Sequence, residues 1–359
     1  NSILIFCFLV IVGMYFGASF LIPLTFGIFL TTLILPICNL LENRLNLGRF
    51  SASFLSTLIL FLVVGGLFFI LFRQLTMFLD DLLEKREDIF AFVETVQQQI
   101  VDSTGFTLKE QEQMFENRLA GMIQETQSYL SGIISDFSGI LFSFLLMLIY
   151  VFFLLVNRDK FSEFLMKYIP DKNKQQTEEI MDKIKMVANR YLWGRVQVMF
   201  VLSIMYTITF YAYDLEYSAL LIIFGVLVTI IPYIGPFLSG LFPIIFMMIM
   251  STNSAEIISF TIIVLIIQLI ESYVLEPVII GSEIKQSPLF VVIAIVLGSA
   301  IWGVAGLILF VPLFGVMKII FDNTKGLEPV GFLVGYESSG TKQSVFDRIR
   351  NKMRGTPKE

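Results

Sequence analysis

The chain of 359 residues contains no histidine and only two cysteines, Cys7 and Cys38. Without imidazole, histidine-ligated metal sites, Ser-His-Asp triads and histidine proton relays are excluded. Both cysteines lie in hydrophobic runs, so we interpret them as apolar packing residues. No glycine-rich phosphate loop ends in Lys-Ser or Lys-Thr, which argues against ATP-driven chemistry by this chain alone. We predict no cofactor and no metal, and no nucleophile–base pattern indicates an enzyme.

Charged residues are scarce, at 15% of the chain, whereas hydrophobic residues make up 56% and the mean hydropathy is +0.81. These values lie far from those of ordinary soluble domains. No basic face or aromatic platform indicates a nucleic-acid partner. Apolar windows recur at 1–41, 51–72, 137–156, 196–213, 217–255, 257–270 and 288–317. The predicted fold class is therefore an all-α polytopic membrane protein.

The first apolar window, 1–41, is too long for a single span. We predict that it forms a helical hairpin that turns between Gly17 and Pro23. A cleaved signal peptide is the alternative for this window. It is disfavoured because the window has no basic n-region and no short apolar region followed by a small-residue cleavage site.

Two uncharged blocks near the C-terminus are interrupted by glycine and proline. The first, Tyr217–Ser251, has 35 residues, and the second, Pro288–Met317, has 30. A membrane helix needs ~20 apolar residues to cross, so each block predicts a hairpin of two short or tilted helices. Paired broken segments of this kind are where transporters place substrate sites. The residues expected to shape the hairpins and their connection are Pro232, Gly235, Pro236, Gly240, Pro277, Gly281, Pro288, Gly303, Gly306 and Pro312.

The distribution of basic residues predicts the orientation. Segments 42–50, 157–195, 276–287 and 322–359 hold 19 of the 25 Lys and Arg residues. By the positive-inside rule, these segments and both termini are cytoplasmic. The predicted divisions are N-terminal transmembrane helices (1–72), an extracytoplasmic amphipathic helical domain (73–136), a transmembrane helix (137–156), a cytoplasmic helical connector (157–195), a C-terminal transmembrane domain with two broken hairpins (196–321) and a cytoplasmic tail (322–359).

The external segment carries an amphipathic pattern. Apolar residues recur at helical spacing over 75–100 and again over 115–133. One short domain can hardly bury such a stripe alone. We expect the stripe to pack on itself or on another subunit, with the membrane surface and direct contact with substrate as the alternatives. We also expect a homo-oligomer in contact with membrane lipid.

The C-terminal motifs resemble those of the AI-2E family of bacterial transporters, also called the autoinducer-2 exporter-like or PerM family. The resemblance covers most of the chain, and the combined pattern is more specific than any one piece. It departs from the family at Val278 and Ser287, where a basic residue and a histidine are common. The residues that carry it are Pro232-Tyr233-Ile234-Gly235-Pro236, Leu275-Glu276-Pro277, Gly281, Pro288, Gly303 through Gly306, and Val311-Pro312-Leu313.

The resemblance implies a multi-pass protein of the bacterial inner (plasma) membrane that assembles as a homo-oligomer. Members of the family are linked to export of the quorum-sensing furanone autoinducer-2, and others to sodium (lithium)/proton antiport. The number of spans is about ten if both C-terminal hairpins cross the membrane and about six if both are re-entrant. The resemblance implies about eight.

The candidate residues of a substrate or ion pathway are Gln268, Glu271, Glu276 and Tyr233. Gln268 and Glu271 are three apart and share a helix face. An intramembrane carboxylate costs ~2.5–3.5 kcal/mol at mid-span and tends to mark ion or proton handling. The alternatives are that Glu271 is solvated near the interface or caps a helix, and that Tyr233 is an interfacial anchor. Ser239, which precedes Gly240, is interpreted as a packing residue.

Three classes of function follow from these features. The first is a secondary transporter or exporter of a small polar solute, coupled to protons or sodium through Glu271 or Glu276. A sodium (lithium)/proton antiporter or a passive channel is the alternative, in which the solute is a monovalent cation or the flux is uncoupled. The third class is an oligomeric envelope scaffold without transport.

Overall fold

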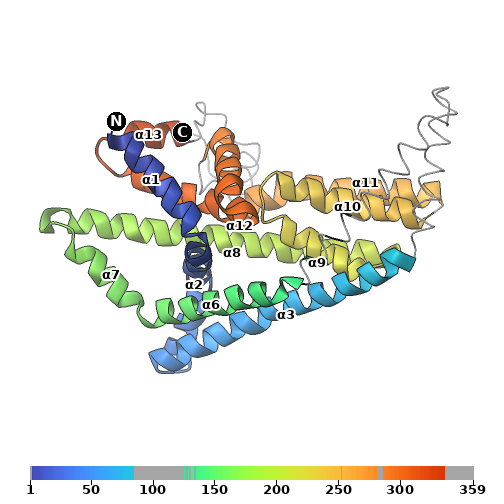
Figure 1. The fold of residues 1–359 in the computed structure, drawn as a ribbon, viewed down its shortest axis with the longest axis horizontal. Coiled ribbons are helices and arrows are strands. Elements are labelled where there is room, and N and C mark those ends of the chain that lie inside the picture. Colours follow the sequence, from blue (N-terminus) through green and yellow to red (C-terminus); the bar gives the residue numbers. More distant parts are fainter. Residues whose placement is uncertain are drawn as a thin grey trace, which may run out of the picture.

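The computed structural model describes residues 2–84, 125, 128, 131–132, 135–251, 253–280 and 286–335. In this part of the chain the regular elements are helices, apart from one isolated bridge between Gln286 and Gly335 (Figure 1). The prediction of an all-α fold is confirmed for these residues. Gly281, most of the predicted external segment 73–136 and the tail beyond residue 335 lie outside them.

The described helices run back and forth in an elongated molecule (Figure 1). They are α1 (Ser2–Phe16), α2 (Ala18–Arg44), α3 (Arg49–Glu84), α6 (Phe137–Val156), α7 (Arg158–Lys167), the 3-10 helix η1 (Asp171–Asn173), α8 (Lys174–Ala212), α9 (Ser218–Val228), α10 (Ile234–Met250), α11 (Ser254–Ile270), the π-helix η2 (Glu271–Ile280), α12 (Pro288–Asp322) and α13 (Glu328–Val334).

Six of the described helical segments are long and apolar enough to cross a membrane. They are α2, α3 as far as Phe78, α6, α8, α11 together with η2, and α12. Helices α9 and α10 are apolar but shorter. At 1.5 Å per residue, the 11 residues of α9 extend about 16 Å, well short of the ~30 Å hydrocarbon core. A multi-pass membrane protein is therefore confirmed, whereas the count of eight spans stays a prediction.

The first predicted hairpin is formed by α9 and α10, which pack against each other. The chain reverses around Tyr233, which has a positive φ of 64°. Gly235 follows at the start of α10, where a Cβ would overlap the backbone of Val228 and Thr229. Only a residue without a side chain allows the two helices to meet this closely.

The second predicted hairpin lies within α12, which reverses at Gly303 (φ 58°, ψ −135°). The backbones of Gly298 and Gly306 touch, because a Cβ on either residue would overlap the other. In a continuous helix, residues eight apart would be separated by about 12 Å. The arms on either side of Gly303 are therefore antiparallel, as the glycine pattern predicts.

The N-terminal window differs from the prediction. Helix α2 begins at Ala18 and contains Pro23, so the predicted turn between Gly17 and Pro23 is wrong. The Gly17 N–H donates to the Gly13 carbonyl and the Leu21 N–H donates to the Gly17 carbonyl, so helical hydrogen bonds continue on both sides. The direction of the chain changes at Gly17 alone. Pro23 is the sixth residue of α2 and has no N–H to donate to the Ser19 carbonyl, so α2 continues through it with one backbone hydrogen bond missing.

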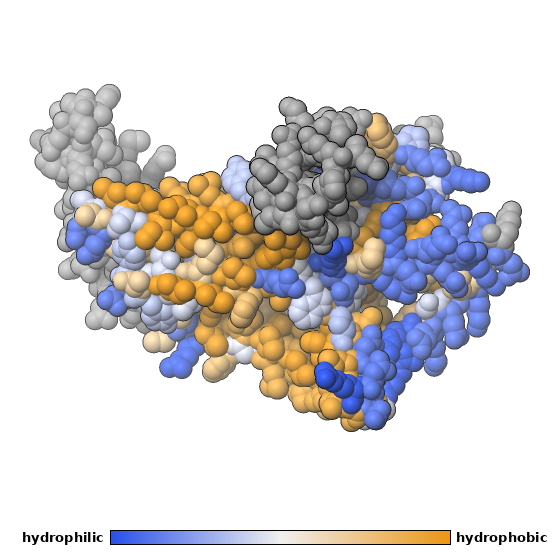
Figure 2. Space-filling view, turned by 180° about the vertical axis from the view of Figure 1, so that it is seen from behind, coloured by the Kyte–Doolittle hydropathy of each residue, from blue (hydrophilic) through white to orange (hydrophobic). Residues whose placement is uncertain are grey.

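Helix α8 runs without a break from Lys174 to Ala212. It therefore joins the predicted connector 157–195 to the predicted span 196–213 in one rod. Polar residues gather at one end of the molecule, over α7 and the first turns of α8, and apolar residues cover much of the remaining visible face (Figure 2). This division is typical of a protein whose middle contacts lipid and whose end contacts water.

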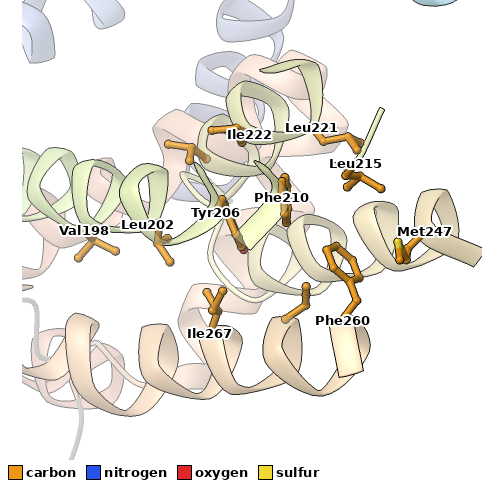
Figure 3. Close-up of a cluster of buried hydrophobic side chains, with 12 residues drawn as sticks. Val198, Leu202, Tyr206, Phe210, Leu215, Leu221, Ile222, Met247, Phe260 and Ile267 are labelled. Carbon is orange, nitrogen blue, oxygen red and sulfur yellow. The ribbon is translucent and has the colours of Figure 1, made fainter. Parts of the chain in front are cut away.

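Buried apolar side chains form three clusters. One joins α8, α9, α10 and α11, and its side chains converge from α8 and α11 around Tyr206, Phe210 and Phe260 (Figure 3). The second joins α2, α3 and α6. The third packs the α12 hairpin against α2 and α1. The first cluster surrounds the candidate site described next.

Candidate functional site

The site lies where α8 packs against the π-helix η2. Helix α11 passes directly into η2 at Glu271, and Pro277 lies inside η2. Gly194 of α8 allows the close approach, because a Cβ there would lie 3.3 Å from the Cα of Ile280. Pro277 cannot donate a backbone hydrogen bond, and π-helical turns inside α-helices are frequent at functional sites.

Glu271 is the first residue of η2 and is fully buried, with 0% of its surface exposed. Neither carboxylate oxygen has a hydrogen-bond partner among the described residues. The alternatives of a solvated Glu271 and of a helix-capping Glu271 are therefore wrong. An unpartnered buried carboxylate is costly, so its presence calls for an ion, a proton or a moving partner.

Arg195 of α8 and Glu276 of η2 form an ion pair beside Glu271. The Arg195 Nη1 atom donates to Glu276 Oε1 at 2.5 Å. The Arg195 side chain is 5% exposed and the Glu276 side chain 36% exposed. The two other nitrogens of the guanidinium, Nε and Nη2, are buried and have no partner in the part of the chain that the structure describes. Arg195 and Glu276 both act electrostatically on Glu271.

Gln268 lies one turn before Glu271 and joins three helices. Its Nε2 donates to Tyr206 Oη of α8 at 2.8 Å and to Ser239 Oγ of α10 at 3.0 Å. Tyr206 in turn donates to Ser239 at 3.3 Å, and Ser239 donates to the Pro236 carbonyl at 3.1 Å. The Gln268 Oε1 atom is buried and unpartnered. Ser239 is fully buried where α9 and α10 pack, as its interpretation as a packing residue implies, and it is also a hydrogen-bonded member of the site.

We call the residues Arg195, Tyr206, Ser239, Gln268, Glu271 and Glu276 the Glu271 cluster. Two of the predicted pathway residues, Gln268 and Glu271, lie together in it, and Glu276 joins them through Arg195. Tyr233 is 58% exposed at the α9–α10 turn, and no hydrogen bond links it to the cluster among the described residues. Gly240 lies against the Gln268 side chain: a Cβ added to Gly240 would lie 3.1 Å from Gln268 Nε2.

Sequence reasoning missed Arg195 and Tyr206. Arg195 is the last charged residue before the apolar window 196–213, a position that a topology argument assigns to the interface. Tyr206 is one aromatic residue among many in an apolar helix. The only available signal for Arg195 was its position: it is a charged residue at the start of a predicted span, in a chain that also contains a proline-interrupted segment.

The remaining shaping residues occupy the hairpins rather than the cluster. Pro232 and Pro236 flank the α9–α10 turn, Pro288 is the first residue of α12, and Pro312 is buried in its second arm. Gly303 and Gly306 form the reversal of α12. No group of three or more potential metal ligands of the Cys, His, Asp and Glu types occurs in the described segments.

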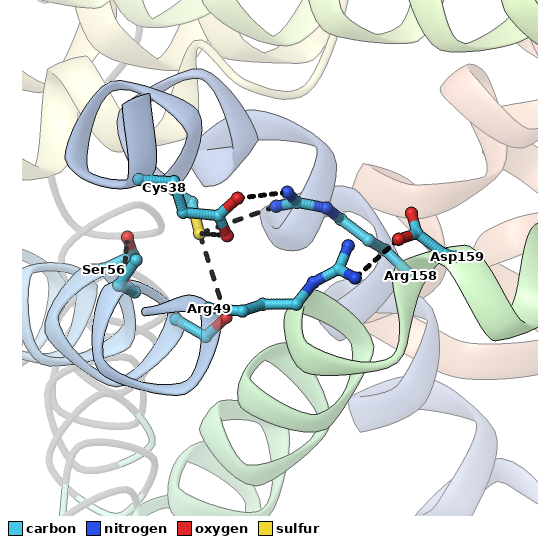
Figure 4. A network of polar contacts seen from close by, with 8 residues as sticks. Cys38, Arg49, Ser56, Arg158 and Asp159 are labelled. Carbon is cyan, nitrogen blue, oxygen red and sulfur yellow. Dashed lines mark hydrogen bonds and ion pairs between the residues drawn. The ribbon is translucent and has the colours of Figure 1, made fainter. Parts of the chain in front are cut away.

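A second polar network joins α2, α3 and α7 (Figure 4). Arg158 donates to Glu42 at 2.6 Å, and Arg49 donates to Asp159 at 2.5 Å. This hydrogen bond lowers the pKa of Asp159 below its ordinary value. We call this group the Arg158 network; it comprises Cys38, Glu42, Arg49, Ser53, Arg158 and Asp159.

The broken helices, the unpartnered buried charges and the apolar exterior define a multi-pass membrane protein of the transport class. The chain belongs to the AI-2E family: the family described as AI-2E family transporter matches residues 4–326. The "Putative transport protein YrrI" of Bacillus subtilis (strain 168) is 26% identical over 306 residues, which cover 83% of this chain and 85% of that protein. The "Putative transport protein YueF" of the same organism is 24% identical over 212 residues, which cover 58% of this chain and 57% of that protein.

Proposed function

We propose that the protein is a secondary transporter that exports a small polar solute across the bacterial plasma membrane in exchange for a monovalent cation. The family and its relatives support a membrane transport role. The observation that carries the coupling proposal is Glu271, which is fully buried and has no partner for either oxygen. An ionised carboxylate in that position is stabilised by binding a proton or a sodium ion.

In this proposal the charges of the Glu271 cluster determine how many cations are exchanged in each transport cycle. With both carboxylates ionised, Glu271 and Glu276 exceed Arg195 by one negative charge. The α9–α10 hairpin adds no charge, because Tyr217–Ser251 contains none. One bound monovalent cation neutralises the cluster, so we propose one cation for each transport cycle.

The broken elements around the cluster supply the pathway in this proposal. The α9–α10 hairpin contributes Ser239, η2 contributes Glu271 and Glu276, and α8 packs against both. Irregular backbone within a membrane is tolerated where it faces protein or a water-filled cavity. Alternating exposure of Glu271 to the two sides would then require a movement of the hairpin relative to α8.

Flux in proteoliposomes tests the coupling. Autoinducer-2 loaded inside is released into buffers with and without an imposed pH or sodium gradient, and proton movement is followed with a pH-sensitive dye during sodium or lithium pulses. We expect the gradient to accelerate flux in the wild type. In Glu271→Gln the gradient effect should be lost while passive exchange continues, because the pathway remains but the titrating group does not.

One variant serves as a matched control for the flux experiment, and three results would contradict the proposed coupling. Glu178→Gln removes an exposed carboxylate of α8 and should leave the gradient effect intact. Sodium- or lithium-driven proton movement without autoinducer-2 release would identify a cation antiporter. Gradient-independent flux in the wild type would identify a facilitator. No flux of any probe would favour an oligomeric scaffold.

We also propose that α7 and the start of α8 lie in the cytoplasm, since segment 157–195 is rich in basic residues. Single cysteines are introduced into a Cys7→Ser/Cys38→Ser background at Lys174, at the start of α8, or at Ser254, at the start of α11. A membrane-impermeant thiol reagent added to intact cells should label the cysteine at 254 and spare the one at 174. The opposite pattern would reverse the orientation.

A further inference from the structure

The Arg195 guanidinium is held by only one of its three nitrogens. Nη1 binds Glu276, whereas Nε and Nη2 are buried without partners. Nε and Nη2 form the edge of a guanidinium that binds a carboxylate through two parallel hydrogen bonds. Among the described residues, neither carboxylate oxygen of Glu271 has a partner, and Arg195 acts electrostatically on this carboxylate. Unused donors on α8 and unused acceptors on η2 are thus both buried where these two helices pack together.

The π-helix explains why both carboxylates lie near one arginine. Glu271 and Glu276 are five residues apart in η2. In a π-helix the i→i+5 hydrogen bond places such residues about one turn apart, on the same side of the axis. In an α-helix they would point about 140° apart. The π-helical geometry therefore brings Glu271 and Glu276 to the face that packs against α8.

The two carboxylates differ in access to water. Glu276 has a side chain that is 36% exposed, so water can solvate its charge if Arg195 leaves. Glu271 is fully buried, so its charge has no such substitute. An ionised Glu271 thus gains more from Arg195 than Glu276 loses. A protonated Glu271 needs no cation, and Arg195 then pairs with Glu276, as in this structure.

We infer that Arg195 is a positioning residue that exchanges partners, holding Glu276 while Glu271 is neutral and turning to Glu271 when that carboxylate becomes charged. This inference rests on the proposed role of Glu271 in coupling and adds the residue that senses its charge. Because Arg195 lies on α8 and both carboxylates lie on η2, each exchange changes the contact between these two helices. The movement of a buried ion pair would thereby convert binding of a cation into a displacement of η2 along α8.

Within the described segments, the other groups that act on Glu271 or its partners are neutral or already assigned. On α8, Tyr191 interacts with Arg195 and Glu276, and Tyr206 interacts with Glu271. On α11, Gln268 is neutral, and the α9–α10 hairpin contains no charged residue. Arg195 and Glu276 are therefore the charged side chains whose removal should alter the ionisation of Glu271.

Carbodiimide labelling measures the exchange without any transport. Dicyclohexylcarbodiimide reacts with protonated carboxyl groups in apolar surroundings, and mass spectrometry of the reconstituted protein gives the labelled fraction of Glu271 at each pH. We expect labelling to disappear as the pH rises in the wild type. Arg195→Gln should keep Glu271 labelled to a pH higher by roughly one unit or more, since the cation is missing. Arg195→Lys should restore most of the wild-type profile.

A double-mutant cycle separates partner exchange from simple repulsion between the carboxylates. Glu276→Gln should end labelling at a lower pH when Arg195 is present, because Arg195 is then free to hold Glu271. In an Arg195→Gln background the same substitution should have little effect. An equal shift in both backgrounds would mean direct repulsion and would overturn the exchange, as would a profile that none of the variants changes.

Two further measurements, one of folding and one of flux, distinguish the possible outcomes of the labelling experiment. Size-exclusion chromatography and thermal melting show which variants fold, and Glu276→Gln and Arg195→Lys carry the test if Arg195→Gln does not. Flux measured on the same preparations separates the proposals. Labelling profiles that follow the exchange, together with flux that ignores Glu271, would retain the ion-pair exchange and reject its role in coupling.

Discussion

The two halves of the molecule handle charge and helix packing in opposite ways. In the N-terminal half, where α2 and α3 meet α7, both carboxylates of the Arg158 network have an arginine partner. In the C-terminal bundle, Glu271 has none and Arg195 uses one nitrogen of three. Helices α3 and α6 are continuous, whereas α9–α10 and α12 reverse direction and α11 becomes π-helical. Satisfied networks fix a structure, and unsatisfied ones in broken helices indicate a part that binds or moves.

The largest expected effect comes from the close helix contact in the C-terminal bundle. In Gly306→Leu the new side chain meets the backbone of Gly298, which cannot move aside without opening the α12 hairpin. We expect a loss of stability at or above the ~1–3 kcal/mol typical of overpacking. Gly139→Leu in α6 is the matched control, because no atom lies within 4 Å of its added Cβ. Equal melting temperatures of the two variants in detergent would contradict this contact.

The next effect tests the contrast between paired and unpaired charge. Glu42→Gln leaves Arg158 without its carboxylate in a partly buried site, and we expect a loss of ~1–3 kcal/mol. Glu271→Gln removes a buried charge that has no partner, so it should leave stability unchanged or raise it. Thermal melting of both variants measures this difference. A larger loss in Glu271→Gln than in Glu42→Gln would break the comparison.

A smaller effect concerns the hydrogen bonds between helices. Tyr206→Phe removes the hydroxyl that binds Gln268 and Ser239, but Gln268 keeps its bond to Ser239. We expect a loss of ~0.5–1.5 kcal/mol. Tyr213→Phe is the control, since its hydroxyl binds Ser259 in a less buried position where water can replace it. If the control loses as much stability as Tyr206→Phe, the Glu271 cluster does not hold its helices more tightly than an ordinary contact.

Much of the fold could be predicted from the sequence, because glycine and proline interrupt apolar runs at visible places. The reversals at Tyr233 and Gly303 follow from such interruptions. The turn predicted between Gly17 and Pro23 fails, because α2 continues through Pro23 with one backbone hydrogen bond missing. The prediction that the α12 block is a hairpin succeeds, since Gly298, Gly303 and Gly306 together permit backbone contact that a single glycine does not require.

The candidate site was only partly predictable. Glu271 and Gln268 stand out as polar residues in an apolar window, which any reading of the sequence finds. The pairing of Arg195 with Glu276 depends on a contact between residues 81 positions apart and on the π-helical turn that presents Glu276. The spacing of residues within a short segment reveals neither the change from α-helix to π-helix nor the packing of α8 on η2. The positive charge beside η2 comes from Arg195 of α8, outside the local sequence of that segment.

The smallest expected effect is the pH dependence of the outer ion pair in the Arg158 network. The hydrogen bond from Arg49 lowers the pKa of Asp159 below its ordinary value of 3.8. A lowered pKa in the folded state means that the pair stabilises the protein above the unfolded pKa, and that this contribution disappears as the pH falls through the folded pKa. The pair is largely exposed, with side chains 36% and 66% accessible, so we expect at most a few tenths of a kcal/mol. Melting temperatures between about pH 3 and pH 6 should therefore fall slightly more for the wild type than for Asp159→Asn. The difference between the two proteins should shrink in high salt, and a difference that persists there would show that Asp159 acts by something other than its charge.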